Sequence, residues 1–167
     1  MNPSHVVISL QDKRNLIEQV VVALTANLAL LKKSAESAHS GATHSDAVAK
    51  SKYDTHGLEL SYLAGSHFER ALRLERELEQ LRKMSISVHS SSKAISLGSV
   101  IFLATGSEVK TYFLSLFGVG IQVEWLGYKV SVISPDSPIG AQLLGGFLGD
   151  DIDFADSKVE SEVLAIF

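Results

Sequence analysis

The most constraining feature of this 167-residue sequence is a heptad repeat of apolar residues near its N-terminus. Between Ile17 and Ala42 the apolar positions alternate steps of four and three residues, and no proline interrupts them. This spacing is typical of a helix that buries one continuous stripe against another helix. A second stripe with the same alternation runs from Tyr53 to Leu81. Together the stripes predict an antiparallel helical hairpin whose turn lies within residues 43–52.

The two stripes also predict a register for the hairpin. Matching Ile17 with Leu78 places Leu31 opposite Ala64. Leucines dominate the stripes near the open end of the hairpin, whereas alanine and glycine dominate near the turn. Small residues bury less apolar area, so we expect the end of the hairpin at the turn to be thinner and less stable than the open end.

The composition of the chain changes after residue 84. Residues 1–84 carry 11 basic and 10 acidic side chains, whereas residues 85–167 carry 4 basic and 9 acidic ones, which together give the net charge of −4. Five of the eight residues in 85–92 are serines. We therefore predict a hairpin domain over 1–84, a serine-rich linker over 85–94 and a second domain over 95–167.

The second domain has the pattern of a small sheet. Four β-favouring runs, separated by turn residues, are spaced like an antiparallel meander, at 99–104, 109–117, 121–125 and 128–133. Ser137 fits a helix N-cap, Pro138 the first helical position and Gly145 the position just past a short helix, and a closing strand follows at 159–166. The predicted fold class is α+β, with an N-terminal antiparallel coiled-coil hairpin and a C-terminal antiparallel sheet domain that carries one short helix.

Several functions are excluded or disfavoured by composition. The chain has no cysteine, which excludes disulfides, thiolate zinc sites and cysteine nucleophiles. The net charge of −4 disfavours sequence-specific nucleic-acid binding. No run approaches about 18 consecutive apolar residues, and the N-terminus lacks the pattern of a signal peptide. No P-loop is present, and no histidine follows Lys93 to act as a general base in the sheet domain. We expect a cytoplasmic protein that does not span a membrane.

A set of motifs in the second domain is similar to a known family. After the N-terminal hairpin come Val130–Ser134, then Ser137-Pro138-Ile139, Leu143-Leu144-Gly145 and Gly149-Asp150. In this order they resemble the carboxy-terminal domain of the GreA/GreB transcript-cleavage factors, with motif-level similarity over about residues 128–154. The resemblance implies an FKBP-like fold for this domain.

The resemblance also implies a function. Factors of this family regulate transcription elongation by docking at the rim of the secondary channel of bacterial RNA polymerase, with the hairpin tip near the active centre. Carboxylates at the tip help to hold a Mg²⁺ ion that belongs to the polymerase site, and Mg²⁺ prefers such oxygen ligands. By resemblance the tip acids here are Asp54, Glu59 and Asp46, of which Asp54 and Glu59 share the Mg²⁺. The docking candidates are, likewise by resemblance, Ser137, Pro138, Ile139 and Gln142.

The resemblance implies that the chain is a monomer that stimulates the polymerase's own RNA cleavage, with no catalytic residue, metal or cofactor of its own. DNA binding is a property associated with the family as a whole, and nothing in this sequence indicates it separately. One departure is that His56 stands where the family has a tip glutamate. Two alternatives therefore remain: a channel-binding modulator that does not support cleavage, and a coiled-coil adaptor or peptide-binding protein unrelated to transcription.

Overall fold

The computed structural model describes residues 7–43, 55–86, 93–152 and 161–167, and the chain divides into two compact units. One unit comprises Met1–Val21 together with Leu81–Phe167, and the other is Val22–Gln80. The predicted fold class is confirmed: a long helical hairpin is followed by a sheet with one short helix. The predicted linker lies mainly outside the described residues, and the predicted domain boundaries stay a prediction.

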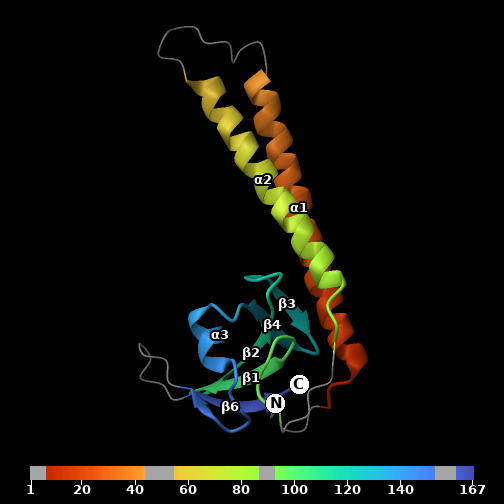
Figure 1. Ribbon diagram of the computed structural model, residues 1–167, viewed down its shortest axis with the longest axis vertical. Coiled ribbons are helices and arrows are strands. Elements are labelled where there is room, and N and C mark those ends of the chain that lie inside the picture. The colour runs from red at the N-terminus through yellow and green to blue at the C-terminus, as the bar shows by residue number, and fades with distance from the viewer. Residues whose placement is uncertain (1–6, 44–54, 87–92, 153–160) are drawn as a thin grey trace. The chain divides into compact units, whose positions relative to one another are not determined.

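The unit Val22–Gln80, called the hairpin unit below, is a pair of antiparallel helices. Helix α1 (Leu10–Thr43) and helix α2 (His56–Arg82) lie side by side in this unit (Figure 1). Every described position of the two predicted stripes is buried or half-buried, so the heptad pattern correctly identified the packed faces. His67, which falls within the α2 stripe, is half-buried there.

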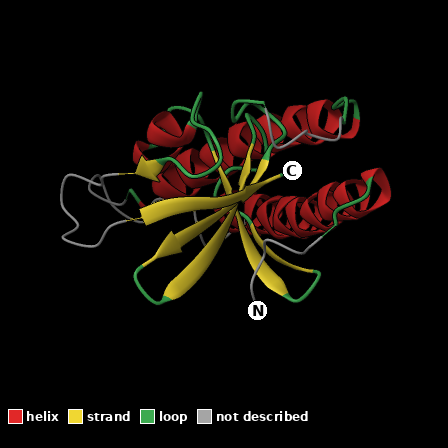
Figure 2. Ribbon diagram, turned by 90° about the horizontal axis from the view of Figure 1, so that it is seen from below, coloured by secondary structure: helices red, strands yellow, loops and turns green. Residues whose placement is uncertain are grey.

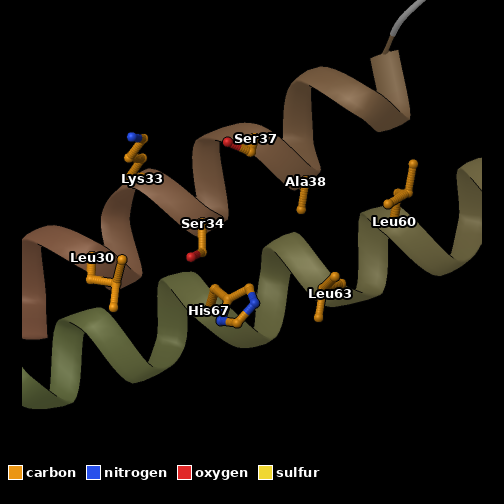
Figure 3. A pocket seen from close by; sticks show the side chains of 8 residues that line it. All are labelled: Leu30, Lys33, Ser34, Ser37, Ala38, Leu60, Leu63 and His67. Atoms are coloured by element: carbon orange, nitrogen blue, oxygen red, sulfur yellow. The ribbon is translucent and has the colours of Figure 1, made fainter.

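The predicted register of the hairpin is wrong by about one heptad. Ser34 points towards His67 in Figure 3, and a Cβ added to Gly41 would lie 3.0 Å from Leu60 Cδ1. In the predicted register, which pairs Leu31 with Ala64, each α1 residue would lie opposite an α2 residue about seven positions away from the one that it faces in the structure. A heptad stripe looks the same after a slip of seven residues, so the stripes alone do not select one register. The prediction was anchored on Ile17, which packs against the sheet instead.

Helix α1 begins seven residues before the predicted stripe because Ser9 and Asp12 cap it. The Asp12 N–H donates to Ser9 Oγ at 3.1 Å, and the Ser9 N–H donates to Asp12 Oδ2 at 2.9 Å. The Ser9 hydroxyl also donates to Asp12 Oδ2 at 2.6 Å. This reciprocal arrangement satisfies N–H groups that the first helical turn leaves without partners. The hydrogen bonds from Ser9 favour the charged carboxylate and lower the pKa of Asp12.

The unit that comprises Met1–Val21 and Leu81–Phe167, called the sheet unit below, is built on a six-stranded mixed sheet in the order β3-β4-β2-β1-β6-β5. Figure 2 shows its strands fanned out by the twist of the sheet. The strands are β1 (Val100–Thr105), β2 (Glu108–Leu114), β3 (Gln122–Trp125), β4 (Tyr128–Ile133), β5 (Asp151–Ile152) and β6 (Ser161–Ile166), with helix α3 (Pro138–Leu143) between β4 and β5.

The prediction of a purely antiparallel meander is wrong for one pair of strands. Strand β4 pairs with β2 in parallel, between β2 and β3, whereas β3 pairs antiparallel with β4 alone at the edge. Burial accounts for this order. Val130 and Val132 of β4 are buried, whereas Gln122 and Glu124 of β3 are exposed. The apolar strand takes the interior of the sheet and the polar strand takes the edge, where charged side chains hinder further pairing.

Both faces of the sheet are covered. On one face, Ile101, Leu103, Tyr112 and Leu114 pack with Leu143 of α3. The opposite face carries the larger aromatic residues, and it is covered by the start of α1 and the end of α2. That cluster contains Ile8, Leu16, Ile17, Val20, Leu81, Val100, Phe102, Phe113, Trp125, Val130, Val132 and Ala165. The first turns of α1 therefore form part of the core of the sheet unit.

Two contacts fix the start of α1 to strands far away in the sequence. The indole Nε1 of Trp125, a residue only 2% exposed, donates to the Asp12 carbonyl oxygen at 2.7 Å. Gly118, in the β2–β3 connection, has φ +70, and a Cβ there would lie 2.8 Å from Val20 Cγ1. A side chain of any size at position 118 is therefore excluded by α1 as well as by its backbone conformation.

Among the described residues, α1 is the one helix long and apolar enough to cross a membrane by length and composition alone. Core helices of soluble proteins and signal sequences meet the same criterion. In this hairpin, Lys32 Nζ of α1 lies 2.6 Å from Glu75 Oε1 of α2, and both side chains are about half exposed. Pairing with a charge-rich helix favours a water-exposed hairpin over a membrane span.

We predict that Gly118→Ala destabilises the protein more than Gly120→Ala does, by about 1–3 kcal/mol. Both glycines have positive φ, but a Cβ at Gly120 meets nothing within 4 Å, so this variant isolates the backbone strain. Adding Val20→Ala to Gly118→Ala should recover part of the difference, because it removes the atom that the new Cβ contacts. Urea unfolding measures all the variants; equal losses for the two glycine variants would contradict the packing of α1 on this loop.

Candidate functional site

Of the three predicted tip acids, only Glu59 is among the described residues. Asp46 and Asp54 lie outside the described residues, so their prediction as tip acids remains a prediction. Glu59 is described and lies in the first turn of α2. Its carboxylate Oε1 accepts a hydrogen bond from the Thr55 hydroxyl at 2.7 Å, while its backbone N–H donates to the Thr55 carbonyl at 2.9 Å.

Glu59 therefore has a structural role that the resemblance to GreA/GreB factors did not predict. A negative charge in the first turn of a helix interacts favourably with the N-terminal end of the helix dipole, and the bond with Thr55 holds the carboxylate there. The side chain is exposed, so its second carboxylate oxygen can reach a ligand in solution. The same residue can stabilise the start of α2 and present a carboxylate near the end of the hairpin.

The predicted docking residues lie on and before the short helix α3. Ser137 is its N-cap: the Ser137 Oγ accepts from the Gly140 N–H at 3.0 Å and donates to the Ser134 carbonyl at 2.7 Å. Gly140 packs so closely on the loop that a Cβ would clash with the Ser134 carbonyl oxygen. The Ser-Pro-Ile segment thus forms a capped helix held tightly to the loop before it, as the sequence predicts.

The four docking candidates differ in how much surface they offer. Pro138 and Gln142 are exposed, whereas Ile139 is half-buried against the core on the α3 side of the sheet. Ser137 is half-buried, and its hydroxyl is occupied by the cap. Leu143 is buried, whereas the adjacent Leu144 is 47% exposed. The helix ends at Leu143, and the extended backbone of Leu144 turns its side chain outward.

The structure adds an apolar patch beside α3 that the sequence reasoning missed. Leu97, Leu144, Phe147 and Leu148 are each 47–49% exposed and come from two adjacent loops. The loops are joined by two backbone hydrogen bonds, from the Gly145 N–H to the Ile95 carbonyl and from the Ile95 N–H to the Gly146 carbonyl. Large apolar side chains that stay half-exposed on neighbouring loops are typical of an interaction surface. The run from residue 143 to 148 is apolar or glycine in the sequence, which is the signal that could have found the patch.

A shallow groove of about 490 Å³ lies between the two helices of the hairpin (Figure 3). Leu30, Leu60 and Leu63 supply apolar side chains to it, and Lys33 and His67 supply polar ones. In Figure 3 Lys33 extends away from α2 while His67 lies between the helices. The groove has no acidic side chain in its lining, so it offers no carboxylate to a metal ion.

Lys13 is the least exposed ionisable side chain described, at 3% exposure, near the start of α1. Burial disfavours its ammonium form and lowers its pKa to about 8. It lies in the part of α1 that packs on the sheet, one residue after the Asp12 carbonyl that binds the Trp125 indole. Lys13 is therefore a titratable group inside the core of the sheet unit.

In the described ranges, no three or more His, Asp or Glu side chains come together in a group that could hold a metal ion. Glu59 and the α3 residues belong to different compact units, so the structure presents two candidate sites. One is the start of α2, and the other is α3 with its adjacent patch. Neither has the nucleophile and base arrangement of an enzyme active site among the residues described.

No protein-family model matches this sequence, and no curated protein is significantly similar to it. Among solved structures, the chain is similar to GreA factor homolog 1 (Gfh1) of Thermus thermophilus at 23% identity and a TM-score of 0.36, covering 88% of this chain and 94% of that one. Gfh1 of Thermus aquaticus matches at 22% identity and a TM-score of 0.36, covering 89% and 94%.

A third structure, described as the transcription factor Gfh1, matches at 24% identity and a TM-score of 0.35, covering 90% of this chain and 92% of that one.

We predict that the stability of the wild-type protein relative to a Lys13→Met variant rises as the pH increases from 8 to 10.5. Below pH 8 the native state holds a buried charge. Between pH 8 and 10.5 the native lysine loses its proton while the unfolded one keeps it, so the wild type gains stability with pH relative to the variant. Thermal unfolding of both proteins from pH 6 to 10 measures this; a constant difference in Tm would show that Lys13 is not buried as a charge.

We predict that Ser137→Ala destabilises the protein by about 1 kcal/mol because the Gly140 N–H loses its capping oxygen. Ser137→Thr is the matched control, since it keeps a hydroxyl that can make both bonds. Chemical unfolding compares the three proteins. If Thr and Ala at position 137 cost the same free energy, the cap does not stabilise α3.

Proposed function

We propose that this chain is a regulator of transcription elongation that binds bacterial RNA polymerase at its secondary channel, in the cytoplasm, as one copy per polymerase. The observation that carries the proposal is the capped Ser-Pro-Ile helix. Ser137 caps α3, Gly145 follows the C-cap residue of this helix with a positive φ, and Gly149 lies in the following turn with φ +83. These are the motif residues on which the resemblance to GreA/GreB factors rests, and each occupies a position that its residue type requires.

The sheet unit supplies a docking surface with suitable chemistry. Pro138 and Gln142 are exposed on α3, and the apolar patch of Leu97, Leu144, Phe147 and Leu148 lies on the loops next to this helix. Exposed apolar side chains near polar ones are typical of protein–protein contact. We assign the docking role to this surface and give Ser137 and Ile139 the role of holding α3 in place.

The hairpin unit supplies a pair of long helices that are joined to each other at one end. The 34 residues of α1 make a helix about 51 Å long at 1.5 Å per residue, which is long enough to enter a deep channel. In the proposal the connection between α1 and α2 approaches the polymerase active centre, where Glu59, Asp54 and Asp46 are the acidic residues available. The chemistry of RNA cleavage would belong to the polymerase and its Mg²⁺.

One observation favours a modulator that does not support cleavage. Glu59 is held by the Thr55 hydroxyl at the start of α2, and His56, the first residue of that helix, stands where the related factors have a glutamate. A carboxylate fixed on a helix start has less freedom to reach a metal than one on a loop. In this version the chain occupies the channel and alters the polymerase without completing a second metal site.

The test uses purified bacterial RNA polymerase in a backtracked elongation complex labelled at the RNA. We predict that the chain binds this complex and that Phe147→Ser weakens binding at least tenfold, as expected for a central apolar contact. Val119→Ser is the matched control, because Val119 is 48% exposed on the β2–β3 loop and lies outside the patch.

The same assay separates the versions of the proposal. RNA shortening that is lost in Asp54→Ala and Glu59→Ala variants indicates stimulation of cleavage, whereas binding without shortening indicates the modulator. Absence of binding to the polymerase at saturating concentration overturns both and leaves the adaptor alternative.

A further inference from the structure

The groove between α1 and α2 in the hairpin unit combines leucines with side chains that donate hydrogen bonds (Figure 3). Its volume of about 490 Å³ falls within the range of small-molecule sites. Among its lining residues, all of which the structure describes, there is no carboxylate. The apolar lining and the donors are Leu30, Leu60 and Leu63 and, respectively, Lys33, Ser34, Ser37 and His67. Such a lining complements a molecule that has an apolar body and an anionic end.

The groove exists because α1 presents short side chains where α2 presents longer ones. The residues that α1 contributes at positions 34, 37 and 38 are serine, serine and alanine, whereas α2 contributes two leucines and a histidine. Short side chains leave a hollow beside long ones. One turn further along α1 the helices approach closely, because a Cβ added to Gly41 would lie 3.0 Å from Leu60 Cδ1. The hollow therefore follows from the size of the side chains.

Two polar side chains face each other inside this hollow. His67 occupies a position of the apolar α2 stripe, and Ser34 points towards it from α1; both are half-buried. Among the residues that the structure describes, the His67 ring and the Ser34 hydroxyl have no hydrogen-bond partner. Half-buried polar groups without a protein partner lower stability relative to an apolar contact. The pair is therefore unfavourable for packing and available to a ligand.

Lys33 supplies a positive charge beside the groove. Its neighbour Lys32 is held by Glu75, with 2.6 Å between Nζ and Oε1, whereas Lys33 is exposed and makes no ion pair with a described residue. In Figure 3 the Lys33 side chain extends away from α2, and rotation about its flexible four-carbon stem can bring the ammonium over the groove. An ammonium beside neutral donors complements a carboxylate, and charge-assisted hydrogen bonds of this kind are the stronger class.

We propose that this groove binds a small amphipathic anion, a carboxylate carried on an aliphatic chain. The aliphatic chain lies against the three leucines. The carboxylate accepts hydrogen bonds from the Ser34 hydroxyl and a His67 ring N–H, and it pairs with Lys33. Because the groove is shallow, we expect a Kd of about 1 mM for an eight-carbon acid. This binding site lies within the hairpin unit and does not depend on the proposed function.

Titration of the full chain with sodium octanoate, followed by NMR of the histidine rings, tests the proposal. The His67 signals, assigned with a His67→Gln variant, should shift and saturate. Those of His39, which is exposed on α1 and does not line the groove, should stay in place. Octylammonium chloride, which has the same chain and the opposite charge, should bind at least tenfold more weakly.

Two outcomes of this titration overturn the proposal. One is the absence of any shift of His67 up to about 10 mM octanoate, a concentration well above the expected Kd. The other is equal binding of octanoate and octylammonium, which would indicate adsorption to apolar surface without recognition of the negative charge.

Substitutions at the groove test where the anion lies. Lys33→Glu should weaken octanoate binding at least tenfold, and Lys83→Glu is the matched control, because Lys83 is exposed and does not line the groove. Ser34→Leu should abolish binding by filling the hollow, with circular dichroism confirming that the helices remain. Octanoate binding that both Lys33→Glu and Ser34→Leu leave unchanged contradicts this site.

His67→Leu separates a binding role of the histidine from a packing role. Leucine continues the apolar stripe of α2, so we expect the midpoint of urea unfolding to rise. Octanoate binding, followed from the ligand signals, should fall at least tenfold in the same variant. A variant that is less stable than the wild type, or that binds octanoate equally well, contradicts the assignment of His67 to the ligand.

Discussion

The structure depends most on the packing of the first turns of α1 against one face of the sheet. Leu16 and Val20 are fully buried there with Phe102, Phe113 and Trp125, and the Trp125 indole binds the carbonyl of Asp12. Without this layer the aromatic face of the sheet would meet water, because α3 covers the other face. A sheet needs both apolar faces covered to be stable, so the sheet unit depends on residues from the beginning of the chain.

This dependence explains why the sequence predicted the elements better than their arrangement. The heptad stripes identified the buried faces of α1 and α2 correctly, since periodicity is a local property. The register failed because Ile17, which the stripe assigned to the hairpin, packs against the sheet. Packing against α2 and packing against the sheet both require an apolar residue at position 17, so the sequence alone does not distinguish the two arrangements.

A similar limit applied to the sheet and to the candidate sites. Turn residues located the strands well, but the insertion of β4 between β2 and β3 depends on which strand is buried by distant residues. The cap at Ser137 was predicted because its donors and acceptors are within three residues. The apolar patch around Phe147 was missed because Leu97 comes from another part of the chain, and Glu59 gained a role through its contact with Thr55 that a family comparison does not show.

In the proposed function, the sheet unit holds the docking surface and the hairpin unit carries acidic residues at its connected end. Site-specific cross-linking tests this claim most directly. Thr43, the last residue of α1, can be replaced by the only cysteine of the chain and coupled to a short photoreactive group. With a bacterial elongation complex, the account predicts cross-links from position 43 to polymerase residues beside the catalytic Mg²⁺, and none there from a cysteine at Lys129. Cross-links from position 43 confined to the outer surface of the polymerase would contradict it.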